Sequence, residues 1–310
     1  MKSLLIVAGP TASGKTAVCL EIAKKLPVEM ISFDSMQVYK GLPIVTQAPV
    51  LAEKKKLRAH LVSFLETSRT FGAARFRDEA TSLIEKIGGR GRTPLLSGGT
   101  GLYIRSLLSG LFNHEDAPAT DLKLRKKLLD AQEKHGGLYL HEKLHLLDPS
   151  SAAKIHPNDH RRLVRALEVF ELSGEPLSVQ KTRRSGLREK FHCPIFFLER
   201  DRQDLYARIE RRVDVMVKQG LVQEVKRALK KRLGLTASGA LGIKEIKTFL
   251  EGRSALEEAV QLLKQHTRNY AKRQLSWFRH EEGVVRVPVA ADEKPRKIAQ
   301  TILKLWEGSQ

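Results

Sequence analysis

Residues 1–16 read MKSLLIVAGPTASGKT, and this stretch decides the fold class of the chain. The apolar run 4–7 is typical of a strand that is buried on both faces. Residues 9–16 match the phosphate-binding pattern G-x-x-x-x-G-K-[ST], and a stretch with helical periodicity follows them. A chance glycine-rich turn would lack this strand–loop–helix context. We therefore expect a phosphate-binding loop at the start of an α/β domain.

The loop offers three kinds of group to an anion. Its glycines permit a tight turn and a close approach of the backbone, so that its N–H groups point at the phosphates. Lys15 adds a full positive charge, and the Thr16 hydroxyl is placed to hold Mg²⁺. The candidate phosphate-binding residues of the loop are Gly9, Thr11, Ala12, Ser13, Gly14, Lys15 and Thr16. The motif leaves open which phosphates are bound.

Two further strand-to-turn junctions carry polar groups. A second strand, 27–33, leads into Asp34, and a third, 93–97, leads into Gly98-Gly99-Thr100-Gly101. Ligand groups gather at the carboxyl ends of strands in an open parallel sheet, so Asp34 lies beside the loop if the second strand neighbours the first. Asp34 can also cap the turn that follows it. Three such units predict an α/β fold with a P-loop-containing, doubly wound parallel sheet core.

The chain changes character after Gly110. No buried strand is evident until 195–198, which predicts a helical insertion at 111–193 between two core segments, 1–110 and 194–310. Within the insertion, Asn158 or Asp159 is expected to cap a helix that carries Arg161 and Arg165 on one face.

Two further helices concentrate positive charge. The helical stretch 201–229 carries Arg208 and Arg212 one turn apart, for which a solvent-facing pair is the alternative. The helix 261–279 is the most basic, because no acidic residue occurs between Ala259 and His280. These cations predict phosphate contacts.

Composition narrows the class of protein. The 310 residues carry a formal net charge of +20, which predicts a polyanionic partner such as a nucleic acid, unless the source proteome is basic throughout. No run of about 18 apolar residues occurs, so no membrane-spanning segment is expected. The N-terminus reads as a strand rather than a signal peptide. The two cysteines, Cys19 and Cys193, fit no metal-ligand spacing and suit a reducing cytoplasm, where we expect the protein to act.

Six blocks in this order resemble the tRNA dimethylallyltransferases (isopentenyl-diphosphate:tRNA transferases), a resemblance that covers about residues 4 to 280. The blocks are GPTASGKT (9–16), DSMQVYKG (34–41), GGTGLY (98–103), HPND with RRLVRALEVFELSG (156–174), LYARIERRVDVMVKQGL (205–221) and TRNYAKRQLSWFR (267–279). The resemblance implies transfer of a dimethylallyl group from dimethylallyl diphosphate to N6 of the adenosine 3′-adjacent to a tRNA anticodon, with release of diphosphate.

The resemblance also implies roles for single residues. Asp34 hydrogen-bonds N6 and removes its proton, while Thr100 lies near the bridging oxygen. Arg212, and more weakly Arg208, join the loop in binding the diphosphate, and Mg²⁺ is the implied cofactor. The implied tRNA contacts are Asp34, Ser35, Met36, Gln37, Arg161, Arg162, Leu163, Val164, Arg165, Gly239, Gly242 and Lys244. The implied partners are tRNA and dimethylallyl diphosphate, and a monomer is expected.

The chain departs from the family pattern in two places. The family usually continues the second block with I-G-T-A-K-P, where this chain has Ile44-Val45-Thr46-Gln47-Ala48-Pro49. It usually has G-Y-K-E where this chain has Gly242-Ile243-Lys244-Glu245. Three alternatives remain open at this point: an adenylate isopentenyltransferase acting on free AMP or ATP, a P-loop small-molecule kinase, and a non-catalytic RNA-binding module.

Overall fold

The computed structural model describes residues 3–49, 56–110, 121–180 and 185–309. The chain divides into two compact units, one formed by Met1–Leu108 with Leu187–Gln310 and one by Ser109–Gly186. The second boundary therefore falls seven residues before the predicted one at 193. The reason is that Leu187 and Cys193 are buried in the hydrophobic core of the first unit.

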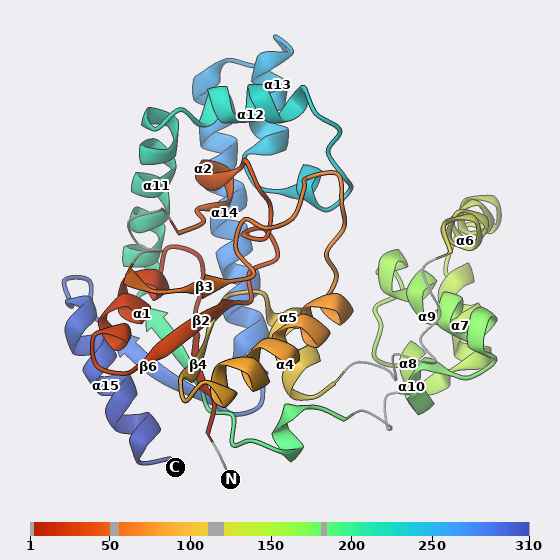
Figure 1. The fold of residues 1–310 in the computed structure, drawn as a ribbon. Coiled ribbons are helices and arrows are strands. Elements are labelled where there is room, and N and C mark those ends of the chain that lie inside the picture. The colour runs from red at the N-terminus through yellow and green to blue at the C-terminus, as the bar shows by residue number, and fades with distance from the viewer. Residues whose placement is uncertain (1–2, 50–55, 111–120, 181–184, 310) are drawn as a thin grey trace. The chain divides into compact units, whose positions relative to one another are not determined.

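A six-stranded sheet forms the centre of the first unit, with the strand order β3-β2-β4-β1-β5-β6 (Figure 1). Every pair of neighbouring strands is parallel, which confirms the predicted doubly wound α/β class. The strands are β1 (Leu5–Ala8), β2 (Val28–Ser32), β3 (Ala59–His60), β4 (Thr93–Gly98), β5 (Ile195–Arg200) and β6 (Val284–Val289). The short strand β3 was not predicted.

The second strand does not neighbour the first. Strand β4 lies between them, so that Leu95 pairs with Leu5 on one side and with Met30 on the other. The premise that would have put Asp34 beside the loop through adjacent strands is therefore wrong. Asp34 still emerges at the same edge of the sheet as the loop, because parallel strands all end at one edge.

Alternate residues of β1 face opposite sides of the sheet, which explains the two layers of helices. Leu5 and Val7 pack into a core with α1 (Lys15–Ala23) and α15 (Pro295–Glu307). Ile6 and Ala8 pack into a second core, to which α4 (Ala73–Gly89) and α5 (Gly101–Leu108) contribute. These two layers cover the sheet in Figure 1.

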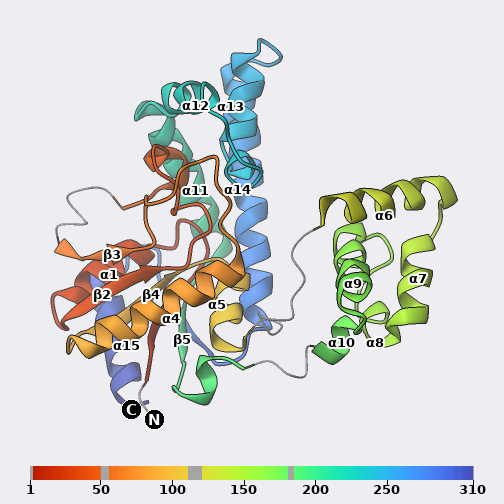
Figure 2. The same cartoon turned by 45° about the vertical axis from the view of Figure 1, so that its right-hand side comes forward.

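Further helices of the first unit stand beyond the carboxyl edge of the sheet, where α11 and α14 run side by side (Figures 1 and 2). The predicted helical stretch 201–229 is two helices, because Gly220 takes a left-handed φ of 98° and ends the first one. The helices of this group are α2 (Pro43–Thr46), α11 (Arg202–Lys218), α12 (Leu221–Leu229), α13 (Ile243–Leu250) and α14 (Leu256–Arg279).

The second unit is helical and has its own core (Figure 2). Its helices are α6 (Leu122–His135), α7 (Tyr139–Leu147), α8 (Pro149–Ala152), α9 (His160–Ser173) and α10 (Leu177–Gln180). Asp159 caps α9 by accepting a hydrogen bond from the Arg162 amide, at 3.2 Å, so it is the cap among the two predicted candidates. Among the described residues, no helix is both long and apolar enough to cross a membrane.

Candidate active site

The phosphate-binding loop joins β1 to α1, as the motif requires. Gly14 adopts a left-handed φ of 99°, a backbone conformation that residues with a side chain rarely adopt. A Cβ atom on Gly9 would lie 2.7 Å from Ser13 Oγ and 3.3 Å from Leu198 Cβ, so a larger residue there would force the Ser13 side chain to move. Backbone geometry therefore favours glycine at position 14, close packing favours it at position 9, and the loop ends where α1 begins at Lys15.

Lys15 is held against its own loop. Its Nζ donates hydrogen bonds to the carbonyl oxygens of Gly9, at 2.9 Å, and Pro10, at 2.8 Å. Burial lowers the pKa of Lys15 to about 8, the nearby carboxylate of Asp34 opposes that shift, and the cation of Arg212 reinforces it. Lys15 is thus a desolvated cation, and a bound anion would favour its charged form.

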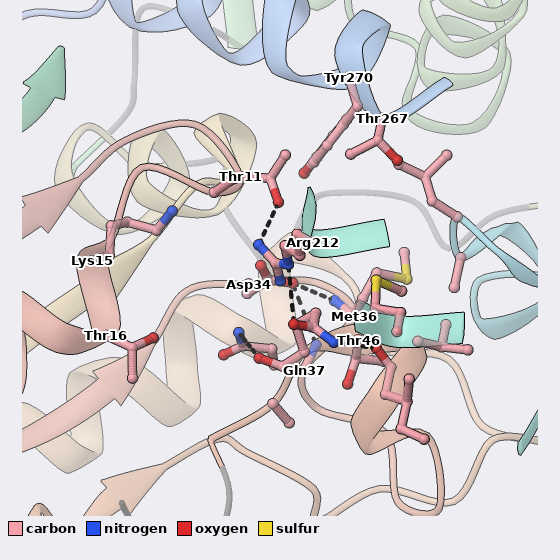
Figure 3. A pocket seen from close by; sticks show the side chains of 18 of the residues that line it. Thr11, Lys15, Thr16, Asp34, Met36, Gln37, Thr46, Arg212, Thr267 and Tyr270 are labelled. Atoms are coloured by element: carbon pink, nitrogen blue, oxygen red, sulfur yellow. Dashed lines mark hydrogen bonds between the residues drawn. The ribbon is translucent and has the colours of Figure 1, made fainter. Parts of the chain in front are cut away.

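A cavity of about 1010 Å³ opens above the carboxyl edge of the sheet. The residues around it come from the loop, the segment after β2, and helices α11 and α14 (Figure 3). The predicted site residues that line it are Thr11, Ala12, Gly14, Lys15, Thr16, Asp34, Ser35, Met36, Gln37, Arg208, Arg212 and Gly239. Segments that are far apart in sequence thus meet in one cavity.

The two arginines of α11 bind the loop instead of facing solvent as a pair. Arg208 donates from Nε to the carbonyl oxygen of Ala12, at 3.0 Å. Arg212 donates from Nη1 to Thr11 Oγ1, at 3.0 Å (Figure 3). Burial lowers the pKa of Arg212 to about 10, with the Asp34 carboxylate opposing the shift. Even so lowered, the guanidinium is charged at neutral pH and lies beside the phosphate-binding loop.

Asp34 both shapes its own turn and faces the cavity. Its Oδ1 accepts hydrogen bonds from the amides of Met36, at 2.9 Å, and Gln37, at 3.3 Å. The same carboxylate interacts electrostatically with Lys15 and Arg212, and Figure 3 shows it next to the Arg212 guanidinium. The turn-capping role considered from sequence is therefore real, and it coexists with a place in the cavity.

Thr100 supports the Asp34 segment. Its Oγ1 accepts a hydrogen bond from the Ser35 amide, at 3.0 Å, and its amide donates to the carbonyl oxygen of Phe33, at 3.3 Å. The Tyr270 side chain of α14, whose pKa is raised by burial, also interacts with the Thr100 side chain. Thr100 thus connects the turn after β4 with the turn after β2 and with α14.

Comparison with known proteins identifies the family. The family model described as IPP transferase matches residues 37–281. The chain belongs to the IPP transferase family.

Two relatives and two solved structures illustrate the likeness. The tRNA dimethylallyltransferases of Carboxydothermus hydrogenoformans and Geobacter metallireducens are 44% and 43% identical to this chain, and each alignment covers 91% of both proteins. A tRNA isopentenylpyrophosphate transferase from Bacillus halodurans is 38% identical, with a TM-score of 0.72, 99% of this chain and 98% of that chain covered.

A eukaryotic dimethylallyltransferase, described in crystallographic snapshots as acting on tRNA, has a TM-score of 0.83 at 28% identity, covering 100% of this chain and 80% of that one. These findings confirm the predicted resemblance. They support the tRNA enzyme and not the adenylate transferase or the small-molecule kinase.

Sequence reasoning missed two side chains that hold the phosphate-binding loop in this member of the IPP transferase family. Gln274 of α14 accepts from the Thr11 amide and donates to the carbonyl oxygen of Gly99, each at 2.9 Å. Arg200, at the end of β5, donates from Nε to the carbonyl oxygen of Ser13, at 3.0 Å. Gln274 lies in one of the matching blocks, which was a signal for it. No sequence pattern marked Arg200.

The residues of α9 that were predicted to contact tRNA differ in how far their side chains are buried. The side chains of Leu163 and Val164 lie in the core of the helical unit, so the tRNA contact predicted for these two residues would have to be made by their backbone. Arg165 pairs with the buried Glu168, at 2.6 Å. Arg161 and Arg162 are exposed. Of this stretch, two arginines present unburied cations to a partner.

The predicted stretch 239–244 lies in the first unit. Gly239 is exposed, and Lys244 is exposed on α13. Gly242 is buried, caps α13, and donates its amide to Glu245 Oε2, at 2.8 Å. Ile243, which stands where the family usually has tyrosine, is buried in the core. An apolar core residue thus fills that position in this chain.

Proposed function

We propose that this protein transfers a dimethylallyl group from dimethylallyl diphosphate to N6 of the adenosine 3′-adjacent to the anticodon of tRNA. The observation that carries the proposal is the meeting of Asp34 with Lys15 and Arg212 in one cavity. Transfer needs an acceptor for the N6 proton beside cations that hold the leaving diphosphate. These three side chains meet both needs.

The diphosphate half of the site consists of the loop and its cations. Loop N–H groups, the Lys15 ammonium and the guanidinium groups of Arg208 and Arg212 bind the phosphates. As the C1–O bond breaks, its electron pair leaves with the diphosphate, and these fixed groups stabilise the charge that develops there. Lys15, Arg208 and Arg212 are already hydrogen-bonded to the loop, so these three cations need little reorganisation during the reaction.

The nucleophile half is organised by Asp34. The N6 lone pair forms the new N6–C1 bond, and the N6 proton passes to the carboxylate. Oδ1 already accepts two backbone hydrogen bonds, so we assign the proton to Oδ2. Partial ionisation of the allylic carbon lowers the demand on the nucleophile, so a carboxylate is a sufficient base. Thr100 holds Asp34 in position through the Ser35 amide.

The residues present fit a magnesium ion. Thr16 lines the cavity next to Lys15, and no three His, Cys, Asp or Glu side chains cluster as metal ligands within the described part of the chain. The Thr16 hydroxyl is a hard oxygen ligand of the kind that Mg²⁺ accepts, together with substrate phosphates and waters. We propose that the Thr16 hydroxyl holds it. When bound, the ion would neutralise part of the negative charge on the leaving diphosphate.

We propose that each of the two units contributes residues that bind tRNA. The adenine must be extruded from the stacked loop to reach the cavity. Ser35, Met36, Gln37 and Gly239 line that cavity and are proposed to contact the extruded nucleotide. The exposed cations proposed to contact the phosphate backbone are Arg161, Arg162 and Lys244. We further propose that the protein acts as a monomer in the cytoplasm.

One assay tests the function. Purified protein with Mg²⁺ and labelled dimethylallyl diphosphate is incubated with three acceptors: a tRNA with adenosine 3′ of its anticodon, the same tRNA with guanosine there, and AMP. We expect label on the first acceptor alone. Labelling of AMP but not of tRNA would instead identify an adenylate transferase, and turnover of added ATP in a parallel sample without dimethylallyl diphosphate would favour a phosphotransferase.

A further inference from the structure

We propose that Gln47 is a positioning residue for Arg212, and that it links the diphosphate half of the cavity to the half that receives the adenine. This inference rests on the proposed function. Arg212 Nε donates a hydrogen bond to Gln47 Oε1, at 3.1 Å, while Arg212 Nη1 donates to Thr11 Oγ1, at 3.0 Å. Two bonds from different nitrogen atoms fix the plane of a guanidinium group, as a single bond does not.

The Gln47 amide is itself held rigidly. Its Nε2 donates to the carbonyl oxygen of Ile44, at 2.7 Å, so both ends of the amide are engaged. The Gln47 backbone has a left-handed φ of 51° at the end of α2, which turns the residue toward the cavity. The side chain that meets Arg212 is therefore fixed before any substrate binds.

A buried carboxylate anchors the segment that carries Gln47. Glu224 of α12 accepts hydrogen bonds from the amides of Ile44, at 3.1 Å, and Val45, at 2.7 Å. Only 2% of Glu224 is exposed, and burial raises its pKa. Because α2 is a single short turn, this capping contact fixes its start, and Gln47 follows its end.

Gln47 also touches the side of the cavity that is assigned to the base. Its carbonyl oxygen accepts a hydrogen bond from Gln37 Nε2, at 3.2 Å, and Gln37 Oε1 accepts from Ser32 Oγ, at 3.0 Å. One residue thus contacts the arginine assigned to the diphosphate and a glutamine assigned to the nucleotide. The side chain serves the first contact and the backbone serves the second.

At this position the chain departs from the pattern of the family it resembles. Gln47 stands in the stretch 44–49, at the position where the family pattern I-G-T-A-K-P has alanine. An alanine side chain has no oxygen for Arg212 Nε. Without that acceptor, the guanidinium is free to turn toward the Asp34 carboxylate, with which it already interacts. That turn would withdraw the cation from the diphosphate and the carboxylate from the N6 proton.

The test is a double-mutant cycle with Gln47→Ala and Arg212→Lys. We expect Gln47→Ala to lower kcat/KM for dimethylallyl diphosphate by about tenfold, as for a lost hydrogen bond to a charged group, with the KM for tRNA changed by less than about twofold. In the Arg212→Lys background, the same substitution should change kcat/KM by less than about twofold, because lysine has no planar guanidinium group for Gln47 to orient.

A binding measurement repeats the cycle without catalysis. The affinity for inorganic diphosphate, measured by calorimetry, should fall in Gln47→Ala and stay level between Arg212→Lys and the double variant. Gln47→Leu serves as the second variant if Gln47→Ala fails to fold, and Gln203→Ala, an exposed glutamine of α11, is the matched control.

Two outcomes would overturn the inference: an unchanged kcat/KM in Gln47→Ala, or an equal loss in both backgrounds. Both require an active parent protein. Failure of the proposed function, by contrast, would appear as absence of transfer in the unsubstituted chain.

Discussion

Lys15 Nζ lies 2.9 Å from the carbonyl oxygen of Gly9, so the lysine of the phosphate-binding loop closes back on the first residue of that loop. The contact keeps the ammonium buried beside the place where phosphates bind. Burial is the largest cause of its lowered pKa, and the Asp34 carboxylate only partly opposes it. The affinity of this site for anions should therefore depend on pH within an accessible range.

We expect diphosphate binding to weaken as pH rises through about 8. With its pKa lowered to about 8, Lys15 loses its proton in the free protein over that range, whereas a bound anion favours the charged form. Binding should therefore take up a proton above pH 8. Calorimetry with dimethylallyl diphosphate, in buffers of different ionisation enthalpy, measures both effects. The Lys15→Met variant should bind weakly with little pH dependence, and an equally steep dependence in that variant would assign it to another group.

Asp34→Asn should lower turnover by roughly two to four orders of magnitude, as expected for loss of a general base. The amide oxygen can still accept the hydrogen bonds from the Met36 and Gln37 amides, so the turn should persist. Affinity for dimethylallyl diphosphate should stay level or rise, because a negative charge near Lys15 is removed. Single-turnover kinetics measure the chemical step, with Asp292→Asn, an exposed aspartate, as control. Turnover close to that of the parent would remove Asp34 from this role.

Gly101→Ala should destabilise the first unit by about 1 to 3 kcal/mol through overpacking. A Cβ atom on Gly101 would lie 2.2 Å from the ring of Trp277. That ring is not free to move away, because its Nε1 donates to Glu281 and the Arg105 guanidinium covers its face. Urea unfolding measures the change. Gly88→Ala is the matched control, since nothing lies within 4 Å of its added atom, and it should be neutral or slightly stabilising.

Arg161→Gln and Arg162→Gln should each weaken tRNA binding without altering dimethylallyl diphosphate binding. Each substitution removes one exposed cation of α9. The plot of log affinity against log salt concentration should therefore become shallower by about one unit of slope. Titrations at several salt concentrations give the slope. The control is Lys304→Gln, an exposed cation of α15, for which we expect an unchanged slope. A slope equal to that of the parent protein in both arginine variants would show that Arg161 and Arg162 make no phosphate contact.

The sequence by itself determined the local features of this protein. The phosphate-binding loop, its strand and its helix are encoded within the first 23 residues, because backbone geometry at Gly14 and apolar periodicity act over short distances. The same local reasoning gave the parallel α/β class and the helical insertion. The six ordered blocks were enough to indicate the family.

Only the tertiary structure decided which side chains meet. Arg212 and Thr11 are separated by 201 positions and Gln274 and Thr11 by 263, yet each pair is hydrogen-bonded. The strand order, with β4 between β1 and β2, and the pairing of Gln47 with Arg212 are likewise products of long-range packing. No local pattern encodes such contacts, since they depend on how the faces of sheet and helices bury their apolar residues against each other.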